Sequence, residues 1–218
     1  MRVSTASART GTRRATRRRS ARTTIRRRRL ALVSVLAIAV GVLVIMAVRV
    51  GPHAVQELTL PLKHEDIIRQ QAAQKDLDPA LIAAVIYQES KFRDRTSSAG
   101  AKGLMQLLPG TAEFIAHKSG GTRFELQDLG TPQINIAYGS WYLRYLIERY
   151  DGNETLAVAA YNAGEDNVDR WVSKAGGASS FNPATDIPYP ETKAYVAGVL
   201  GKRKAYAQHY AKELGLSH

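Results

Sequence analysis

A run of 19 residues without a charged side chain, residues 30–48, divides this chain into unequal parts. As a helix it would be roughly 28 Å long, close to the ~30 Å hydrocarbon thickness of a bilayer. It is longer than the ~7–15 apolar residues of a cleaved signal peptide, and only Ala47 offers a weak cleavage position. We therefore expect residues 30–49 to form one transmembrane signal-anchor helix, with a cleaved signal peptide as the alternative.

The positive charge of the chain is concentrated before this run. Residues 1–29 contain 12 arginines and no acidic residue, whereas residues 51–218 contain 18 Lys/Arg against 19 Asp/Glu. Such a tail cannot bury a core, so we expect residues 1–29 to be disordered, and the positive-inside rule places them in the cytoplasm. Nucleic-acid binding is the minority alternative, since the tail lacks aromatic residues for base stacking and adjoins the apolar run. We expect no specific nucleic-acid partner.

The remainder is long enough for one domain. Residues 50–63 contain two prolines and are expected to be a linker, and residues 64–218 form a domain that buries about 70% of its unfolded surface. The chain has no cysteine, and its five histidines do not occur in a metal-binding spacing. No phosphate-binding loop or nucleophile-elbow motif is present. We expect no metal and no cofactor.

The apolar spacing of this domain is helical nearly throughout, which predicts an all-α fold. Asp78 and Asn153 are predicted helix N-caps, and Gly164 is predicted to end a helix in a left-handed conformation. In the long helix, six residues are predicted on or near the apolar side: Ile134, Ala137, Tyr138, Trp141, Tyr145 and Ile147. The expected helices cover residues 64–75, 78–90, 103–108, 111–118, 132–150, 154–162, 165–175 and 191–214.

Glu89 ends an almost wholly apolar helical segment. It follows Leu81 and Val85 at intervals of four residues, so it shares a helix face with core residues. Burial disfavours a carboxylate, and the pKa of Glu89 should therefore rise, so that the group keeps a proton that it can donate. The alternative is a buried glutamate paired with a cation such as Arg93 or Lys102.

Three further groups of residues are weaker candidates when each is taken alone. Gly103 permits close backbone approach, Met105 is an ordinary core residue by default, and Gln106 can both donate to and accept from a sugar hydroxyl. Tyr161 and Asn162 end a helix, where they could face a cleft or could simply be a core tyrosine and a cap. Glu191 and Tyr195 are one turn apart, and by default the first is solvated and the second packed.

Taken together and in this order, the motifs resemble the catalytic domain of soluble-type lytic transglycosylases, glycoside hydrolase family 23. The resemblance covers roughly residues 66–205. It is carried by Gln88-Glu89-Ser90, the segment SAGAKGLMQLLPGTA at 98–112, NIAYG at 135–139 with Tyr142-Leu143, AAYNAG at 159–164, and PETKAYV at 190–196. Lys102 departs from the more apolar or small residue expected there.

The resemblance implies a lysozyme-like helical domain and a substrate, the β-1,4 bond between N-acetylmuramic acid and N-acetylglucosamine in the glycan strands of peptidoglycan. Glu89 would be the single catalytic acid and base, closing a 1,6-anhydro ring without water. The substrate-binding residues implied are Ser90, which would orient Glu89, together with Gly103, Met105, Gln106, Tyr161, Asn162, Glu191 and Tyr195.

The apolar run and the distribution of arginine, taken with this activity, predict where the enzyme works. We expect a monomer held in the bacterial cytoplasmic membrane by residues 30–49, with the catalytic domain on the cell-wall side. A hydrolytic muramidase that uses an activated water is the first alternative. A non-catalytic protein that binds or assembles peptidoglycan is the second.

Overall fold

The computed structural model describes residue 40 and residues 59–121 and 123–216. The chain separates into two units, residues 1–58 and 59–218, and the following description concerns the second. Among the described residues, no helix is both long and apolar enough to cross a membrane. The predicted tail, the predicted membrane helix except residue 40, and most of the linker lie outside the described residues, and these assignments remain predictions.

The second unit is built from helices. In the described part of the chain, pairing between extended segments is confined to two isolated bridges, Thr96 with Lys102 and Lys102 with Leu107. The all-α prediction is therefore confirmed for this unit. The helices are α2 (Glu65–Lys75), α3 (Pro79–Ser90), α4 (Pro109–Ser119), the 3₁₀ helix η1 (Leu126–Gly130), α5 (Pro132–Arg149), α6 (Glu154–Ala163), α7 (Glu165–Lys174), α8 (Pro183–Asp186) and α9 (Pro190–His209).

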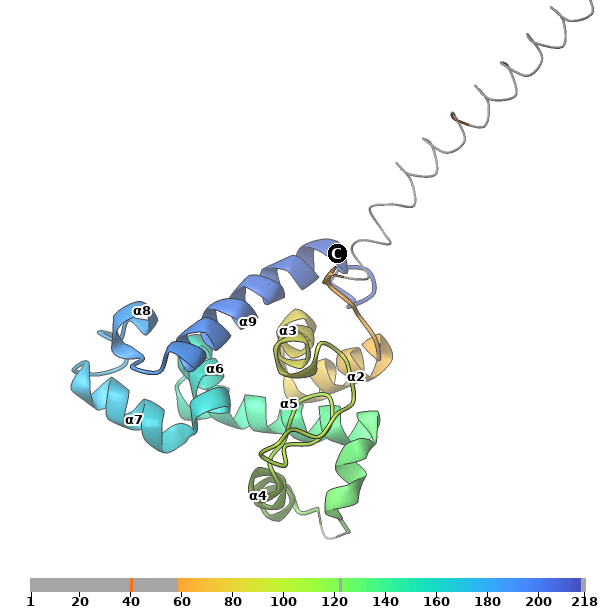
Figure 1. Ribbon diagram of the computed structural model, residues 1–218, viewed down its shortest axis with the longest axis horizontal. Helices are drawn as coiled ribbons and strands as arrows, with labels where there is room; N and C mark the ends of the chain where they lie inside the picture. Colours follow the sequence, from red (N-terminus) through yellow and green to blue (C-terminus); the bar gives the residue numbers. More distant parts are fainter. Residues whose placement is uncertain (1–39, 41–58, 122, 217–218) are drawn as a thin grey trace, which may run out of the picture. The chain divides into compact units, whose positions relative to one another are not determined.

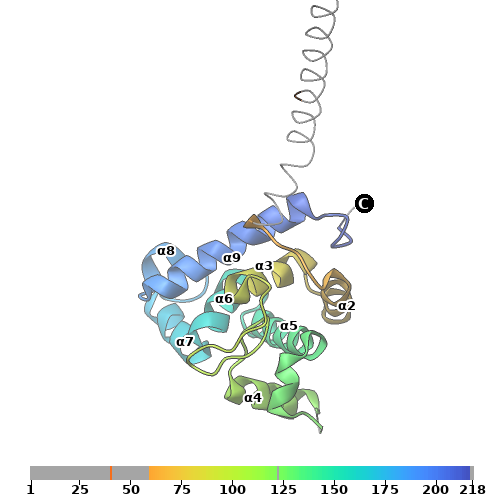
Figure 2. The same cartoon turned by 45° about the vertical axis from the view of Figure 1, so that its right-hand side comes forward.

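Helix α3 is the centre of the core. Residues 80–86 along it are all fully buried, because α2 and α9 pack against it. Figures 1 and 2 show the long helix α9 running beside α3 and α6, with α5 on the other side of α6. A helix that is apolar all round is typical of a core position, so Glu89 is carried near the end of the most buried element.

Two predicted helix starts are confirmed by their hydrogen bonds. Asp78 Oδ1 accepts from the backbone N–H of Ala80 at 2.8 Å, and Asn153 Oδ1 accepts from that of Leu156 at 3.1 Å. Gly164 ends α6 with a positive φ of 85°, but its ψ of 149° is extended instead of left-handed helical. Helix α4 begins at Pro109, two residues before the predicted cap at residue 111.

The predicted helix over residues 103–108 is wrong. Gly103–Gln106 forms turns, and Lys102 and Leu107 exchange backbone hydrogen bonds of 2.9 and 3.0 Å. Two short helices, η1 and α8, lie in stretches predicted to be loops, and α9 ends at His209, five residues before its predicted end. The turn at 103–106 is held by a residue distant in sequence, Asn135, whereas η1 and α8 begin at local caps, Glu125 and Asn182.

The predicted apolar side of α5 is correct only in part, because Tyr138, Trp141, Tyr145 and Ile147 pack against the two buried clusters without being fully buried. The residues that this helix buries are smaller and partly polar, and they are Asn135, Ile136, Gly139, Ser140, Leu143 and Leu146. Tyr138, Trp141 and Tyr145 are only partly buried, and Phe114 of α4 packs edge-on against the last two. The aromatic side chains of α5 therefore form a wall beside the core instead of filling it.

Candidate active site

The carboxylate of Glu89 lies near the C-terminal end of α3 and contacts α9. The hydroxyl of Tyr195 donates a hydrogen bond of 2.6 Å to Oε1 of Glu89. The helices approach closely because Gly198, three residues after Tyr195, has no side chain, and a Cβ there would lie 2.8 Å from Oε1 of Gln88. Two residues 106 positions apart in sequence thereby form one acidic site.

Burial raises the pKa of Glu89 from 4.5 to about 7. The hydrogen bond from Tyr195 and the positive charge of Arg95 both favour the ionised form and lower this pKa, but their effect is smaller than that of desolvation. The predicted upward shift is therefore confirmed, and its cause is the one expected from the sequence. A group with such a pKa can both donate and accept a proton near neutral pH.

The hydroxyl of Tyr161 donates to the backbone carbonyl of Met105 at 3.1 Å. Burial raises the pKa of Tyr161 well above its ordinary value, and the charge of Glu89 raises it further. The same two causes, in the same order, raise the pKa of Tyr195. Both phenols therefore stay protonated and can act only as neutral hydrogen-bonding groups.

Gly103 and Met105 occupy the core. Gly103 has a φ of 78°, and a Cβ on it would lie 2.1 Å from Nδ2 of Asn135. The Met105 side chain is fully buried, and a Cβ on Gly139 would lie 2.4 Å from its Sδ. Gly103 does permit a close approach, as predicted, but the approaching group is a protein side chain. Gly103 has no side chain and that of Met105 is buried, so neither residue offers a side chain to a ligand.

Asn135 holds this turn, and sequence analysis did not single it out as a site residue. Its Oδ1 accepts from the N–H of Met105 at 2.7 Å, and its Nδ2 donates to the carbonyls of Lys102 and Leu129 at 2.9 and 3.0 Å. It is fully buried. A polar residue on the buried side of a helix was the signal that could have identified it.

Gln106 has a fixed orientation. Its backbone is left-handed, with φ of 47°, and its Nε2 donates to the carbonyls of Arg95 and Gly103 at 2.9 and 2.8 Å. Both amide hydrogens are therefore used within the protein. The Oε1 atom accepts no hydrogen bond from the described residues, so it can accept one from a ligand.

Asn162 is held in the complementary way. Its Oδ1 accepts a hydrogen bond of 2.7 Å from the hydroxyl of Thr192, a residue that is 3% exposed and was not predicted. The amide hydrogens of Asn162 have no acceptor within the described part of the chain. Gln106 and Asn162 consequently offer an acceptor and a donor, respectively.

These residues line a cavity of about 220 Å³. Its lining includes Gln106, Tyr142, Tyr161 and Asn162, and the rings of Tyr142 and Tyr161 lie with centroids 5.5 Å apart. Tyr161 connects this cavity with Glu89, whose charge affects its titration. The structure thus brings three predicted residues, Gln106, Tyr161 and Asn162, together at one cavity. Glu89, which is bonded to Tyr195, lies near enough to Tyr161 to affect its titration.

Two predicted residues do not make the expected contacts. The hydroxyl of Ser90 donates to the carbonyl of Ile86 at 3.1 Å, so it does not orient Glu89. Glu191 is exposed on the first turn of α9 and makes no hydrogen bond to the described residues. Its neighbour Thr192 is the residue of this turn that contacts the cavity lining.

Glu165 is the acidic residue that adjoins this region from α7. It forms an ion pair with Arg149, with Nε and Oε2 2.9 Å apart, and it accepts from the hydroxyl of Tyr145 at 3.2 Å. Among the described residues, no group of three His, Cys, Asp or Glu side chains could hold a metal ion. The chemistry that this geometry supports is proton transfer by one carboxylic acid.

Comparison with known proteins gives consistent matches. The family model described as "Transglycosylase SLT domain" matches residues 66–183. A soluble lytic murein transglycosylase of Salmonella typhimurium is 33% identical over 162 residues, covering 71% of this chain and 24% of that protein. A membrane-bound lytic murein transglycosylase F of Pasteurella multocida is 33% identical over 153 residues, covering 64% of this chain and 29% of its own length.

Solved structures match at the same level. The lytic transglycosylase Slt of Pseudomonas aeruginosa, solved as an inactive mutant, superposes with a TM-score of 0.65 at 33% identity, over 71% of this chain and 25% of that one. The 70-kDa soluble lytic transglycosylase of Escherichia coli gives 0.66 at 29% identity, over 74% and 27%.

This chain spans about a quarter of the length of these relatives. The helical architecture and the family model agree, and the fold is the lysozyme-like one expected from the resemblance. The chain belongs to the transglycosylase SLT domain family.

Proposed function

We propose that this protein is a peptidoglycan lytic transglycosylase that cleaves the bond between N-acetylmuramic acid and N-acetylglucosamine without water. The observation that carries the proposal is the buried acid Glu89, whose pKa is about 7, whose Oε1 is held by Tyr195 and whose charge affects Tyr161 of the cavity lining. The similarity to soluble and membrane-bound lytic murein transglycosylases supports the same activity.

In the first step, protonated Glu89 donates its proton to the oxygen that bridges the two sugars. The bond from C1 of the muramoyl sugar to that oxygen breaks, and the N-acetylglucosamine side leaves as an alcohol. Positive charge develops at C1, next to the carboxylate that has just formed. The hydrogen bond from Tyr195 favours this carboxylate, so it assists proton release without preventing protonation beforehand.

In the second step, ionised Glu89 removes the proton from the C6 hydroxyl of the same muramoyl sugar. The C6 oxygen then bonds to C1 and gives the 1,6-anhydro end, and Glu89 regains the proton that it lost. Glu165, the acidic residue of α7 that adjoins this region, is already paired with Arg149. A single carboxylate is sufficient for this cycle, whereas ordinary glycosidases require two.

The cavity residues have complementary roles in this proposal. Oε1 of Gln106 accepts a hydrogen bond from a sugar hydroxyl or acetamido N–H, and the amide of Asn162 donates to a carbonyl or hydroxyl oxygen. Both amides are held by the protein through their other ends, which reduces the entropy lost on binding. Tyr161 supports the backbone at Met105 and lines the cavity.

We further propose that residues 30–49 anchor the protein in the cytoplasmic membrane, with the tail inside and the domain facing the cell wall. The distribution of arginine supports this orientation. A tether keeps an enzyme close to an insoluble polymer and raises its effective concentration there. Protease treatment of intact spheroplasts should digest the domain and leave residues 1–29 protected.

Mass spectrometry of digested peptidoglycan tests the reaction. The full chain should release products with 1,6-anhydro ends, and Glu89→Gln should release none. Glu113→Gln is the matched control, because Glu113 is exposed on α4, and it should retain full activity. Reducing ends in place of anhydro ends would identify a hydrolytic muramidase, and binding of peptidoglycan without any product would identify a non-catalytic protein.

A further inference from the structure

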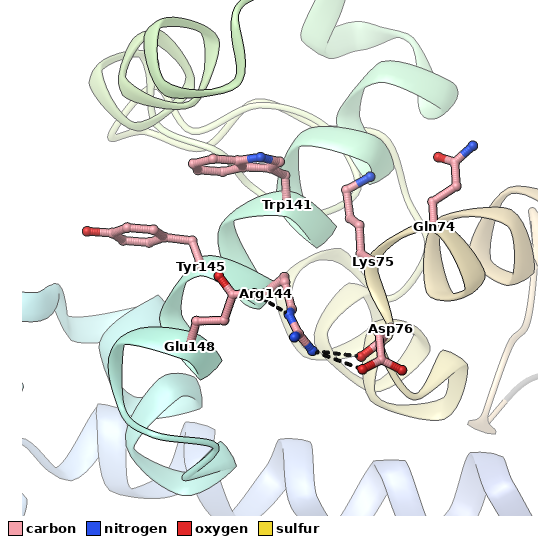
Figure 3. A pocket seen from close by; sticks show the side chains of 7 residues that line it. All are labelled: Gln74, Lys75, Asp76, Trp141, Arg144, Tyr145 and Glu148. Atoms are coloured by element: carbon pink, nitrogen blue, oxygen red, sulfur yellow. Dashed lines mark hydrogen bonds and ion pairs between the residues drawn. The ribbon is translucent and has the colours of Figure 1, made fainter.

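A groove of about 430 Å³ lies between the C-terminal end of α2 and the middle of α5, away from the residues that hold Glu89. Figure 3 shows Trp141 and Tyr145 along one side of it and Gln74 and Lys75 on the other. The ion pair between Arg144 and Asp76 joins the two helices at the groove. The proposed reaction uses none of these side chains.

The aromatic side of the groove is rigid. The rings of Trp141 and Tyr145 are parallel within 5°, with centroids 5.7 Å apart, and Phe114 packs edge-on against them at 6.4 and 5.4 Å. The Tyr145 hydroxyl is bonded to Glu165. The indole N–H of Trp141 has no acceptor among the described residues, so the wall offers flat apolar surface and one unused donor.

The charges of the groove are unevenly paired. Arg144 binds both acids, with Nε 2.7 Å from Oε1 of Glu148 and Nη1 3.4 Å from Oδ2 of Asp76. Lys75 has no carboxylate within ion-pair distance in the described part of the chain, and its ammonium donates to Oε1 of Gln71. Burial lowers the pKa of Lys75, whereas the C-terminal carbonyls of α2 favour its charged form. An entering carboxylate would supply the opposite charge that Lys75 lacks.

A third hollow of about 380 Å³ neighbours both the groove and the cavity at Gln106 and Asn162. That hollow shares Ala163 and Gly164 with the cavity at Gln106 and Asn162, and it shares Tyr145 with the groove. The three hollows therefore neighbour one another through shared lining residues, so one polymer can reach both the cavity and the groove. The occupant of the groove is accordingly a part of the same polymer.

We propose that this groove binds a carboxylate-bearing peptide arm of peptidoglycan, with Lys75 on the carboxylate, the indole N–H of Trp141 on a peptide carbonyl, and the arm lying on the two rings. The identity of the polymer rests on the function proposed above. A neutral sugar would stack on the rings but would leave the ammonium of Lys75 without an opposite charge, which favours the peptide.

Nuclear magnetic resonance of the full chain tests this assignment. The reporter is the indole N–H signal of Trp141, identified by its loss in Trp141→Phe, and the buried Trp171 is the internal reference. N-acetyl-D-alanyl-D-alanine, its C-terminal amide and chitotetraose are titrated separately. The free acid should shift the Trp141 signal, and the amide should bind roughly tenfold more weakly because it lacks the charge.

Lys75→Gln should weaken binding of the acid by roughly tenfold, whereas Lys174→Gln, an exposed lysine on α7, should leave it unchanged. Equal binding of acid and amide to the unmutated protein would overturn the proposal even if Lys75→Gln failed to fold. A shift of Trp141 with chitotetraose and not with the peptide would also overturn it and would assign the groove to sugar.

The two proposals fail separately. Release of anhydro products from peptide-free glycan depends on Glu89 and should be unaffected by Lys75→Gln. If the unmutated protein bound the peptide but released no anhydro products, the proposed reaction would be rejected and the groove would remain a peptide site. Activity retained without any peptide binding would reject the groove alone.

Discussion

The hydroxyl of Tyr195 lies 2.6 Å from Oε1 of Glu89, and this contact works against the burial that raises the pKa of the acid. A hydrogen bond to a charged group is worth about 1.5–3 kcal/mol. Tyr195 therefore brings the pKa of Glu89 down to a value at which the group can both release and recover a proton.

Tyr195→Phe should move the pKa of Glu89 upward by about one unit, since one unit corresponds to ~1.4 kcal/mol. The acid step needs protonated Glu89, so the alkaline limb of the pH–rate profile should move to higher pH. Release of anhydro products measured from pH 5 to 9 checks this. A limb that stays in place would mean that the hydrogen bond does not set the acidity. Tyr189→Phe, on an exposed ring, is the control.

Glu89→Gln should make protein stability less dependent on pH. Between pH 4.5 and about 7 the folded protein holds a proton on Glu89 that the unfolded chain releases, so the free energy of unfolding falls as pH rises through this window. The total loss is roughly 3 kcal/mol at ~1.4 kcal/mol per unit. Urea unfolding followed by tryptophan fluorescence should show the variant to be more stable than the unmutated protein at pH 8 and similar at pH 4.5. A difference that does not change with pH would contradict this origin.

Asn135→Ala should destabilise the protein by about 3 kcal/mol, because it removes three buried hydrogen bonds worth about 1 kcal/mol each. The turn that carries Gln106 loses its support, so substrate binding should weaken as well. Asn153→Ala is a suitable control, since it removes only a helix cap, at a cost of about 1 kcal/mol. Thermal unfolding and KM on solubilised glycan separate the two variants, and an unchanged KM in Asn135→Ala would show that the turn is held by other contacts.

Gly139→Ala and Gly201→Ala should have opposite effects on stability. A Cβ at Gly139 would lie 2.4 Å from Sδ of Met105, whereas a Cβ at Gly201, on the exposed side of α9, meets nothing within 4 Å. Overpacking costs about 1–3 kcal/mol, and replacing an exposed helical glycine by alanine gains about 0.5–1 kcal/mol. Calorimetry of both variants measures the difference. Equal melting temperatures would mean that Met105 can move away from α5.

The sequence predicted features that depend on neighbouring residues. The caps at Asp78 and Asn153 are correct because a cap bonds to backbone two or three residues away. The raised pKa of Glu89 was predicted correctly because the apolar residues before it mark α3 as a core helix, and burial is the main cause of the shift. The family resemblance linked motifs that were weak candidates when taken singly. It thereby identified the residues that line the cavity.

Tertiary structure decided what depends on distant residues. Gly103–Leu108 has a helical spacing but forms a turn, because Asn135 binds its backbone from α5. The wide aromatic residues of α5 were expected on or near its apolar side. The helix places a glycine against Met105, and Trp141 and Tyr145 pack at the margin of the core, where they also line the groove. Local sequence determines the caps at Asp78 and Asn153 and marks the core helix that carries Glu89, because these depend on residues a few positions apart. Close packing between segments determines which face is buried and which side chain reaches that acid.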